Sequence, residues 1–198
     1  MPARSLPLKP SGAGSWLLAI SLTRWNYMLS SLADATAAVV MLTWALVTLE
    51  RPGALLPVAA LALLVYTLIE YLWHRFLFHW RHAPRAARQG HARHHQAPEQ
   101  PLALPFFTAL PHVMVVWGLA SVSGLGSSLG AFFTGVYFVG YVAYTGLHHL
   151  IHAEAIGHPA VAWLRSVHEV HHARPACNFG VTTPLWDIVF GTWLAPLR

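Results

Sequence analysis

The sequence predicts an all-α integral membrane protein with about four transmembrane helices and a cytoplasmic, histidine-rich helical cap. Of its 198 residues, 56% are hydrophobic and only 10% are charged, whereas a soluble domain carries about 25% charged residues. The chain also contains 14 histidines, and histidine is the commonest metal ligand. These observations argue against a soluble enzyme or a disordered chain and for a metal-binding protein embedded in lipid.

The N-terminal residues 1–24 are predicted to form a flexible tail that contains an interfacial helix. Prolines and glycines dominate the first 15 residues. The apolar stretch 16–22 is too short to span a bilayer, and no small-residue cleavage pattern follows it, so an interfacial helix fits better than a signal peptide. Residues 25–198 then form a single membrane domain.

Four apolar stretches in this domain are long enough to span a bilayer, which takes about 20 helical residues. The first ends at the Pro52-Gly53 turn, and the second ends in an aromatic run that suits the headgroup level. No Lys, Arg, Asp or Glu occurs from Gln100 to Ala153, and a Gly/Ser-rich turn at 123–128 divides that stretch in two. The predicted spans are 28–49, 54–78, 104–122 and 129–149. A further helix is expected at 160–174, with turns from Arg174 onward.

Positive charge predicts the orientation of these spans. With four spans, the N-terminal tail, the 79–103 loop and the C-terminal segment share one side, which carries every Lys and Arg except Arg51. The positive-inside rule places this side, both termini and the histidines in the cytoplasm. Topology thus explains the net charge of +5 without a nucleic-acid partner. The single Cys177 suits a reducing compartment.

Ten histidines form four clusters at the predicted cytoplasmic ends of the second and fourth spans and in the segments that follow them. Two clusters share the spacing i, i+3, i+4, which puts three imidazoles on one helical face, and a third has the spacing i, i+4. Ten imidazoles are too many for one ion but suit two. The clusters are His74 and His79; His91, His94 and His95; His148 and His152; and His168, His171 and His172.

His74 and His79 are the exception to this helical spacing. Residues five apart on an α-helix diverge by about 140°. The two side chains can share a site only if the helix bends or bulges there; otherwise they serve two metals. The other histidines match no cluster and are expected to be structural or bystanders: His82, His112, His149 and His158.

Acidic residues are few, which makes their positions informative. Glu70 lies one turn before His74 within apolar sequence, where it can accept the second N–H of a ligating imidazole and fix its tautomer. Asp187 and Glu169 are candidates for the same role. Asp34 is as consistent with an interfacial position as with a functional one.

Imidazole coordination suits zinc, copper, iron or nickel, and the spacing alone does not choose among them. Two neighbouring metals beside a lipid-facing cavity favour O2 activation at an alkyl chain, because hydrocarbon C–H bonds offer hydrolysis nothing to attack. The chemistry therefore favours two iron ions and O2, with zinc as an alternative occupant.

The order HRFLFH (74–79), HARHH (91–95), HHLIH (148–152) and HEVHH (168–172), followed by NFGVTTPLWDIVFGTW (178–193), resembles the fatty acid hydroxylase/sterol desaturase superfamily. The resemblance covers roughly residues 55–195. It implies an integral membrane di-metal oxygenase that hydroxylates or desaturates a lipid C–H bond, most plausibly of a fatty acyl or sterol-like lipid. It also implies that the ten clustered histidines are the ligands and that Asn178, Thr183 and Asp187 lie against the metal site, as Glu70 does by position.

Two departures from the family pattern bear on its partners. No cytochrome b5 domain is fused to this sequence, so the expected electron donor is a separate protein of the cytochrome b5, ferredoxin or reductase type. The chain is also compact, which is similar to carotenoid hydroxylases, although its LWD…FGT ending looks more like the fatty acid and sterol branch.

Two alternatives come from other classes of protein. A membrane metal transporter needs polar groups near the bilayer midplane, whereas these histidines gather at one face. A zinc hydrolase needs a carboxylate base beside an open metal position, and Glu169 is the one candidate. The sequence leaves the lipid, the attacked carbon and the oligomeric state open.

Overall fold

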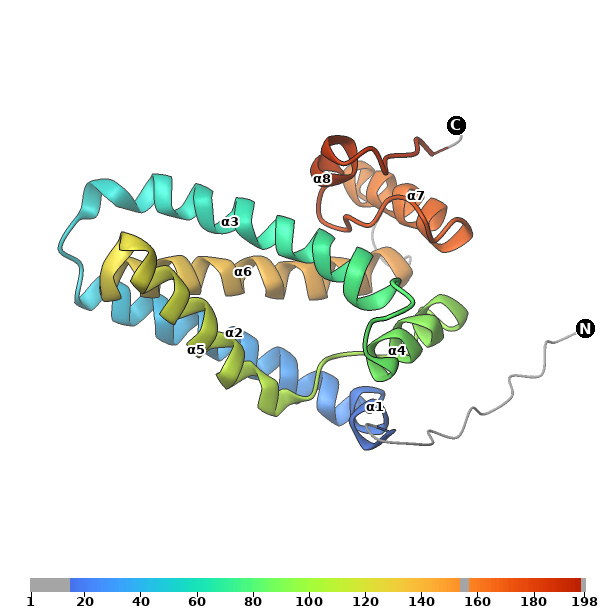
Figure 1. Ribbon diagram of the computed structural model, residues 1–198, viewed down its shortest axis with the longest axis horizontal. Helices are drawn as coiled ribbons and strands as arrows, with labels where there is room; N and C mark the ends of the chain where they lie inside the picture. The colour runs from blue at the N-terminus through green and yellow to red at the C-terminus, as the bar shows by residue number, and fades with distance from the viewer. Residues whose placement is uncertain (1–14, 154–156, 197–198) are drawn as a thin grey trace, which may run out of the picture.

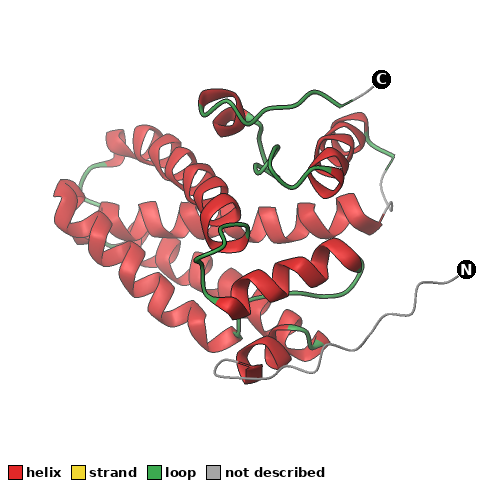
Figure 2. Cartoon of the chain, turned by 45° about the vertical axis from the view of Figure 1, so that its right-hand side comes forward, coloured by secondary structure: helices red, strands yellow, loops and turns green. Residues whose placement is uncertain are grey.

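The computed structural model describes residues 15–153 and 157–196, and this part of the chain is helical with no strand (Figure 2). Four long helical segments, called rods here, pack side by side, and shorter helices gather at one end of them (Figure 1). The rods contain α2 (Arg24–Val47), α3 (Leu55–Leu72), α5 (Ala109–Ala120) and α6 (Gly126–Ala153). The expected all-α class is therefore confirmed. The predicted tail at residues 1–14 lies outside the described residues.

The first two helices follow the N-terminal expectation. α1 spans Ser15–Ser21 and α2 spans Arg24–Val47. Thr23 caps α2, because its hydroxyl accepts the Asn26 N–H at 3.1 Å. α2 thus begins four residues before the predicted span, since the cap, and not the first apolar residue, determines where the helix starts.

The second rod runs from Pro52 to Phe78. It consists of a 3₁₀ turn η1 (Pro52–Ala54), α3 (Leu55–Leu72) and a terminal π-helix η2 (Trp73–Phe78). These bounds agree with the predicted span 54–78. A loop then leads to α4 (Arg85–Gln96), which carries the second histidine cluster.

The charge-free stretch forms a hairpin of two rods. The first is η3 (Phe106–Thr108), α5 (Ala109–Ala120) and η4 (Ser121–Leu125), and the second is α6 (Gly126–Ala153). The chain reverses at Gly124 and Gly126, whose φ angles of 105° and 73° are left-handed. The predicted glycine turn is therefore present.

Among the described residues, three helical stretches are long and apolar enough to cross a membrane: Arg24–Val47, Pro52–Phe78 and Phe106–Ala153. The last includes the hairpin, so four rods arise from three such stretches, and a count of four membrane crossings stays a prediction. The outer surface of the rods is apolar, as Val47, Leu56 and Val122 show with about 80% exposure each. An apolar exterior is what a lipid environment requires.

Small residues let the rods approach each other around α6. Ala45, Ala62 and Ala131 are completely buried in the bundle core. A Cβ atom on Gly140 would lie 2.7 Å from the Tyr66 ring. Close backbone approach at small residues is the usual packing mode of helices in lipid.

The C-terminal segment completes the cap. α7 spans Pro159–Ala173, as predicted, with His158 as its N-cap. The segment after Arg174 was expected to contain only turns, but it includes a short helix, α8 (Leu185–Val189). With α1 and α4, these elements lie at the end of the bundle where α3 and α6 finish (Figure 1).

Candidate metal centre

The π-helix at the end of α3 resolves the unusual spacing of His74 and His79. A π-helix closes its hydrogen bonds over five residues instead of four, so side chains five apart project to the same side. The two imidazole centroids lie 5.2 Å apart. Of the two alternatives, the bulged helix is therefore the one observed, and both residues belong to the same group.

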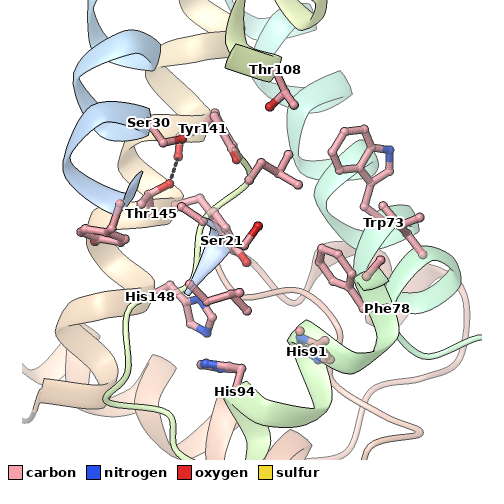
Figure 3. Close-up of a pocket in the computed structure, with 18 of the residues that line it drawn as sticks. Ser21, Ser30, Trp73, Phe78, His91, His94, Thr108, Tyr141, Thr145 and His148 are labelled. Carbon is pink, nitrogen blue, oxygen red and sulfur yellow. Dashed lines mark hydrogen bonds between the residues drawn. The ribbon is translucent and has the colours of Figure 1, made fainter. Parts of the chain in front are cut away.

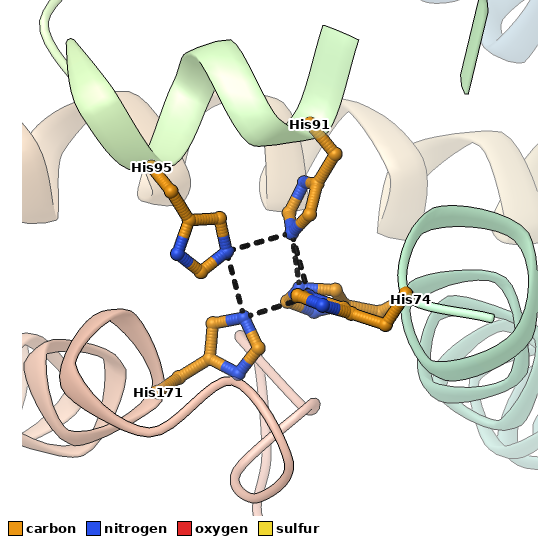
Figure 4. Close-up of side chains that lie close together, drawn as sticks. His74, His91, His95 and His171 are labelled. Atoms are coloured by element: carbon orange, nitrogen blue, oxygen red, sulfur yellow. Dashed lines mark hydrogen bonds between the residues drawn. The ribbon is translucent and has the colours of Figure 1, made fainter. Parts of the chain in front are cut away.

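Five imidazoles from three segments converge on one point (Figure 4). One nitrogen from each lies within 4.8 Å of the others. The Nε2 of His91 is 2.9 Å from that of His79 and 3.0 Å from that of His74. The group, called here the first histidine group, consists of His74, His79, His91, His95 and His171.

A second histidine group lies beside the first. Its members are His94, His152, His168 and His172, again with one nitrogen of each within 4.8 Å of the others. The Nε2 of His148 lies 3.1 Å from that of His168 and 3.2 Å from that of His152, so His148 adjoins this group. The structure thus brings all ten predicted histidines together.

The hydrogen bonds at the backs of the rings fix which nitrogen faces inward. The Nδ1–H groups of His74 and His171 donate to the carbonyl oxygens of Phe179 and Cys177. Because a carbonyl only accepts, these imidazoles carry their proton on Nδ1 and direct the Nε2 lone pair into the group. This is the usual arrangement of metal-ligating histidine.

The inward nitrogens cannot satisfy one another. The Nε2 of His91 has three imidazole nitrogens within 3.0 Å, yet one ring nitrogen can donate or accept only one strong hydrogen bond. The Nε2 of His94 is buried with no hydrogen-bond partner. Converging lone pairs of this kind fit cations, so the donor set suits metal ions and leaves their identity open.

Burial keeps the imidazoles of the cap uncharged. It lowers the pKa of His79 to about 4, with nearby His95 contributing, and that of His172 to about 4. Burial also lowers the pKa of His171 to about 3, although the hydrogen bond to Cys177 opposes the shift. At neutral pH these groups are therefore neutral, as ligation requires.

The loop after α7 contacts the first histidine group on the side of the Nδ1 atoms and is itself fixed by a buried carboxylate. The Asp187 carboxylate is completely buried and accepts the N–H groups of Phe179 and Gly180, each at 2.8 Å, and the Thr192 hydroxyl at 2.7 Å. The Phe179 carbonyl accepts the hydrogen bond from His74 Nδ1–H. Asp187 therefore positions that imidazole through the loop backbone.

Glu70 has a different role from the one predicted. The Phe179 carbonyl, and not Glu70, accepts the His74 N–H. The Glu70 carboxylate accepts the N–H groups of Val181 at 2.6 Å and Thr182 at 2.9 Å. Sequence spacing on one helix could not reveal this, because the partners are more than 100 residues away.

Two other predicted residues also act within the loop. Asn178 is completely buried with a φ of 54°, and its amide donates to Leu194 and Val167 and accepts from the Leu194 N–H. The Thr183 hydroxyl accepts the Leu185 N–H, and it is the neighbouring Thr182 hydroxyl that donates to Glu70. The prediction missed Thr182 and Thr192.

The four histidines expected outside the clusters do lie outside both groups. His82 and His158 are exposed. His112 stacks on Trp73 with 5.7 Å between centroids, and the His149 ring lies 6.2 Å from that of Tyr27. Glu169, the carboxylate that a hydrolase mechanism would use, is exposed.

A cavity of about 390 Å³ leads from the histidines into the bundle (Figure 3). Along α6 its wall runs from His152 to Tyr137, which is about 22 Å of helix. His91, His94 and His148 face its lower end in Figure 3, and Trp73 and Phe78 form one side. The lining is mostly apolar, with hydroxyl groups and two carboxylates, Asp34 and Glu70.

A bundle of apolar helices with two histidine groups at one end of a cavity defines a membrane protein that can hold metal ions beside a lipid-sized site. The chain belongs to the fatty acid hydroxylase family, because residues 59–192 match the sequence profile of that family. The expected family is therefore confirmed.

Several relatives share this region. The chain is 31% identical to dihydroceramide fatty acyl 2-hydroxylase FAH1 of Arabidopsis thaliana over 145 residues, which cover 70% of this chain and 61% of the relative. It is 33% identical to the ceramide very long chain fatty acid hydroxylase SCS7 of Saccharomyces cerevisiae, over 67% of this chain and 36% of the relative. It is 30% identical to human fatty acid 2-hydroxylase, over 73% of this chain and 42% of the relative.

A solved structure has the same fold. The full-length scs7p structure, in which only the hydroxylase domain is visible, superposes with a TM-score of 0.74 at 28% identity and covers 94% of this chain and 72% of that one. This chain thus matches about 60% or less of the length of these curated relatives.

Proposed function

We propose that this protein is a membrane-bound oxygenase that hydroxylates an acyl chain of a ceramide-like lipid at a two-metal centre formed by the two histidine groups. The observation that carries the proposal is that the ten imidazoles gather at one end of an elongated, mostly apolar cavity, and five of them line it. The relatives named for ceramide and fatty acid hydroxylation favour hydroxylation over desaturation and an acyl substrate over a carotenoid.

The residues present fit two metal ions. The first histidine group offers five nitrogens, and the second offers four with His148 adjoining. If iron occupies both groups, it supplies the activation of O2 and the electron transfer that breaking an alkyl C–H bond requires. The chain holds these ions with neutral imidazoles, and the carbonyls of Phe179 and Cys177 hold the protons of His74 and His171 on Nδ1.

The cavity supplies the remaining elements of the reaction. Its apolar wall binds the hydrocarbon chain and excludes water from the histidine end, which limits side reactions. Oxidation of a C–H bond by O2 consumes electrons, and we propose that a donor protein of the cytochrome b5, ferredoxin or reductase type supplies them. We further propose that the cap faces the cytoplasm, because most Lys and Arg residues lie on the cap side of the predicted spans.

The proposal is tested with protein reconstituted in lipid with iron, a reductase chain, a dihydroceramide and ¹⁸O-labelled O2. The expected product is the hydroxylated lipid carrying one labelled oxygen. A product with two hydrogens fewer and no added oxygen would indicate a desaturase. Metal flux across proteoliposomes without O2 consumption would contradict the proposal and favour a transporter.

A further inference from the structure

Asp34 is a carboxylate placed among apolar helices without an evident structural purpose. It lies in α2, within a stretch long and apolar enough to span a membrane, and only 6% of its surface is exposed. An ionisable side chain in such a segment is costly and is usually functional. Asp34 also lines the cavity that leads to the histidines.

The hydrogen bonding of Asp34 is incomplete. Within the described residues, its one hydrogen bond comes from the Ser30 hydroxyl at 3.4 Å, which is longer than the usual 2.5–3.0 Å for an O–H donor. A carboxylate offers about four acceptor positions. Buried polar groups are normally satisfied, so most of the accepting capacity of Asp34 is left for a ligand.

The serine and threonine hydroxyls near Asp34 already donate their protons within the protein. Ser30 donates to Asp34, Ser31 donates to the Tyr27 carbonyl at 2.8 Å, and Thr145 donates to the Tyr141 carbonyl at 3.0 Å. Each hydroxyl has one proton to donate and retains lone pairs. Ser30, Tyr141 and Thr145 lie together above His148 in Figure 3. The three serine and threonine hydroxyls therefore offer acceptor positions to a ligand, and the Tyr141 phenol in the same part of the cavity can also donate.

The position of Asp34 also suits a lipid held near the metal site. The Tyr27 ring lies 6.2 Å from that of His149, next to the cluster residue His148. Asp34 is seven residues further along α2, about 10 Å along the helix axis. A polar group bound at Asp34 would thus lie about 10 Å along the cavity from a carbon presented to the histidines.

From this geometry we infer that Asp34 is a specificity-determining residue that binds a hydroxyl or amide N–H group of the lipid substrate. The inference rests on the proposed function in that it takes the occupant of the cavity to be a lipid. It selects neutral lipids that donate hydrogen bonds. A free fatty acid, whose ionised carboxylate only accepts hydrogen bonds, is repelled by the Asp34 carboxylate.

The test measures binding of a dihydroceramide and of the same lipid with its hydroxyl groups methylated, using tryptophan fluorescence of the purified protein without O2 or reductant. The wild-type protein is expected to prefer the free hydroxyl form by about tenfold, the usual effect of a hydrogen bond to a charged group. Asp34→Leu should bring the ratio of the two affinities close to one. Glu50→Gln, which changes an exposed carboxylate, should leave the ratio unchanged.

Several results would overturn the inference. Equal binding of the two lipids by wild-type protein would do so whether or not any variant folds. An unchanged ratio in Asp34→Leu, or in Asp34→Asn if the leucine variant is unstable, would do so as well. Hydroxylation of the dihydroceramide is measured in parallel. If the protein prefers the free hydroxyl lipid but forms no hydroxylated product, the proposed function is refuted and the role of Asp34 stands. If it forms the product but binds both lipids equally, the role of Asp34 is refuted and the proposed function stands.

Discussion

Single residues behind the imidazoles determine how the nitrogens are presented. Asp187 accepts three hydrogen bonds, two of them from the backbone of Phe179 and Gly180. The Phe179 carbonyl in turn holds the Nδ1 proton of His74. A candidate metal ligand is thus oriented by a carboxylate that does not contact it.

Asp187→Asn is expected to weaken metal affinity by about 10- to 100-fold, as is typical of changes behind a ligating histidine. The NH2 group of asparagine cannot accept, so at least one of the three donors loses its partner. Competition with a chelator measures the affinity. Thr183→Ala, which alters the same loop without contacting Asp187 or His74 in any described hydrogen bond, is the matched control. Equal losses in the two variants would contradict this role.

Removing a ligand from one histidine group should release one ion and retain the other. His171→Ala affects the first group and His172→Ala the second. Metal analysis of each purified variant should give roughly half the wild-type content, because each ion keeps its own set of about four ligands. His82→Ala removes an exposed histidine outside both groups and should keep the full content. Full metal content in both cluster variants would refute the assignment of ligands.

The helical elements show which features sequence spacing can predict. The i, i+3, i+4 clusters of α4 and α7 and the i, i+4 pair of α6 lie on helices, so their grouping followed from periodicity. The pairing of His74 with His79 did not follow, because it depends on a π-helix whose hydrogen-bond pattern the sequence does not reveal. The bonds of Glu70 to the 178–183 loop were unpredictable for another reason, namely that they join segments distant in sequence.

Two glycines of α6 test the packing of the bundle. Gly140→Ala places a Cβ atom 2.7 Å from the buried Tyr66 ring, whereas Gly146→Ala meets nothing within 4 Å. The first change is expected to lower the free energy of unfolding by about 1–3 kcal/mol. The second should raise it by up to about 1 kcal/mol, because alanine favours a helix over glycine. Thermal unfolding in detergent compares the two, and stabilisation by Gly140→Ala would contradict the close contact.

At the scale of the whole molecule, low charge and abundant histidine have one explanation. The apolar rods leave little charged surface, and they deliver both histidine groups to the same end. Composition predicted the class, and the predicted topology of the spans predicted the gathering of the histidines. The side of the membrane on which they lie is a prediction from the distribution of Lys and Arg, since the fold alone does not orient the protein in a bilayer.

Thiol labelling tests this orientation. In intact cells, a membrane-impermeant reagent should label Gly53→Cys, made in a Cys177→Ser background. Gly53 is exposed and belongs to the turn that joins α2 to α3, and that turn lies at the end of the bundle opposite the cap (Figure 1). The native Cys177 beside the first histidine group should react only after the membrane is permeabilised. Labelling of Cys177 from outside, with Gly53→Cys protected, would reverse the proposed topology.

The most direct test of the account is the number of metal ions bound by purified wild-type protein, counted by elemental analysis against protein concentration. Ten converging imidazoles in two groups predict about two ions per chain, since a protein-bound ion of this type takes about four to six ligands. A content of one ion or fewer in protein supplied with excess iron or zinc would contradict the two-metal centre on which the proposed oxygenase depends.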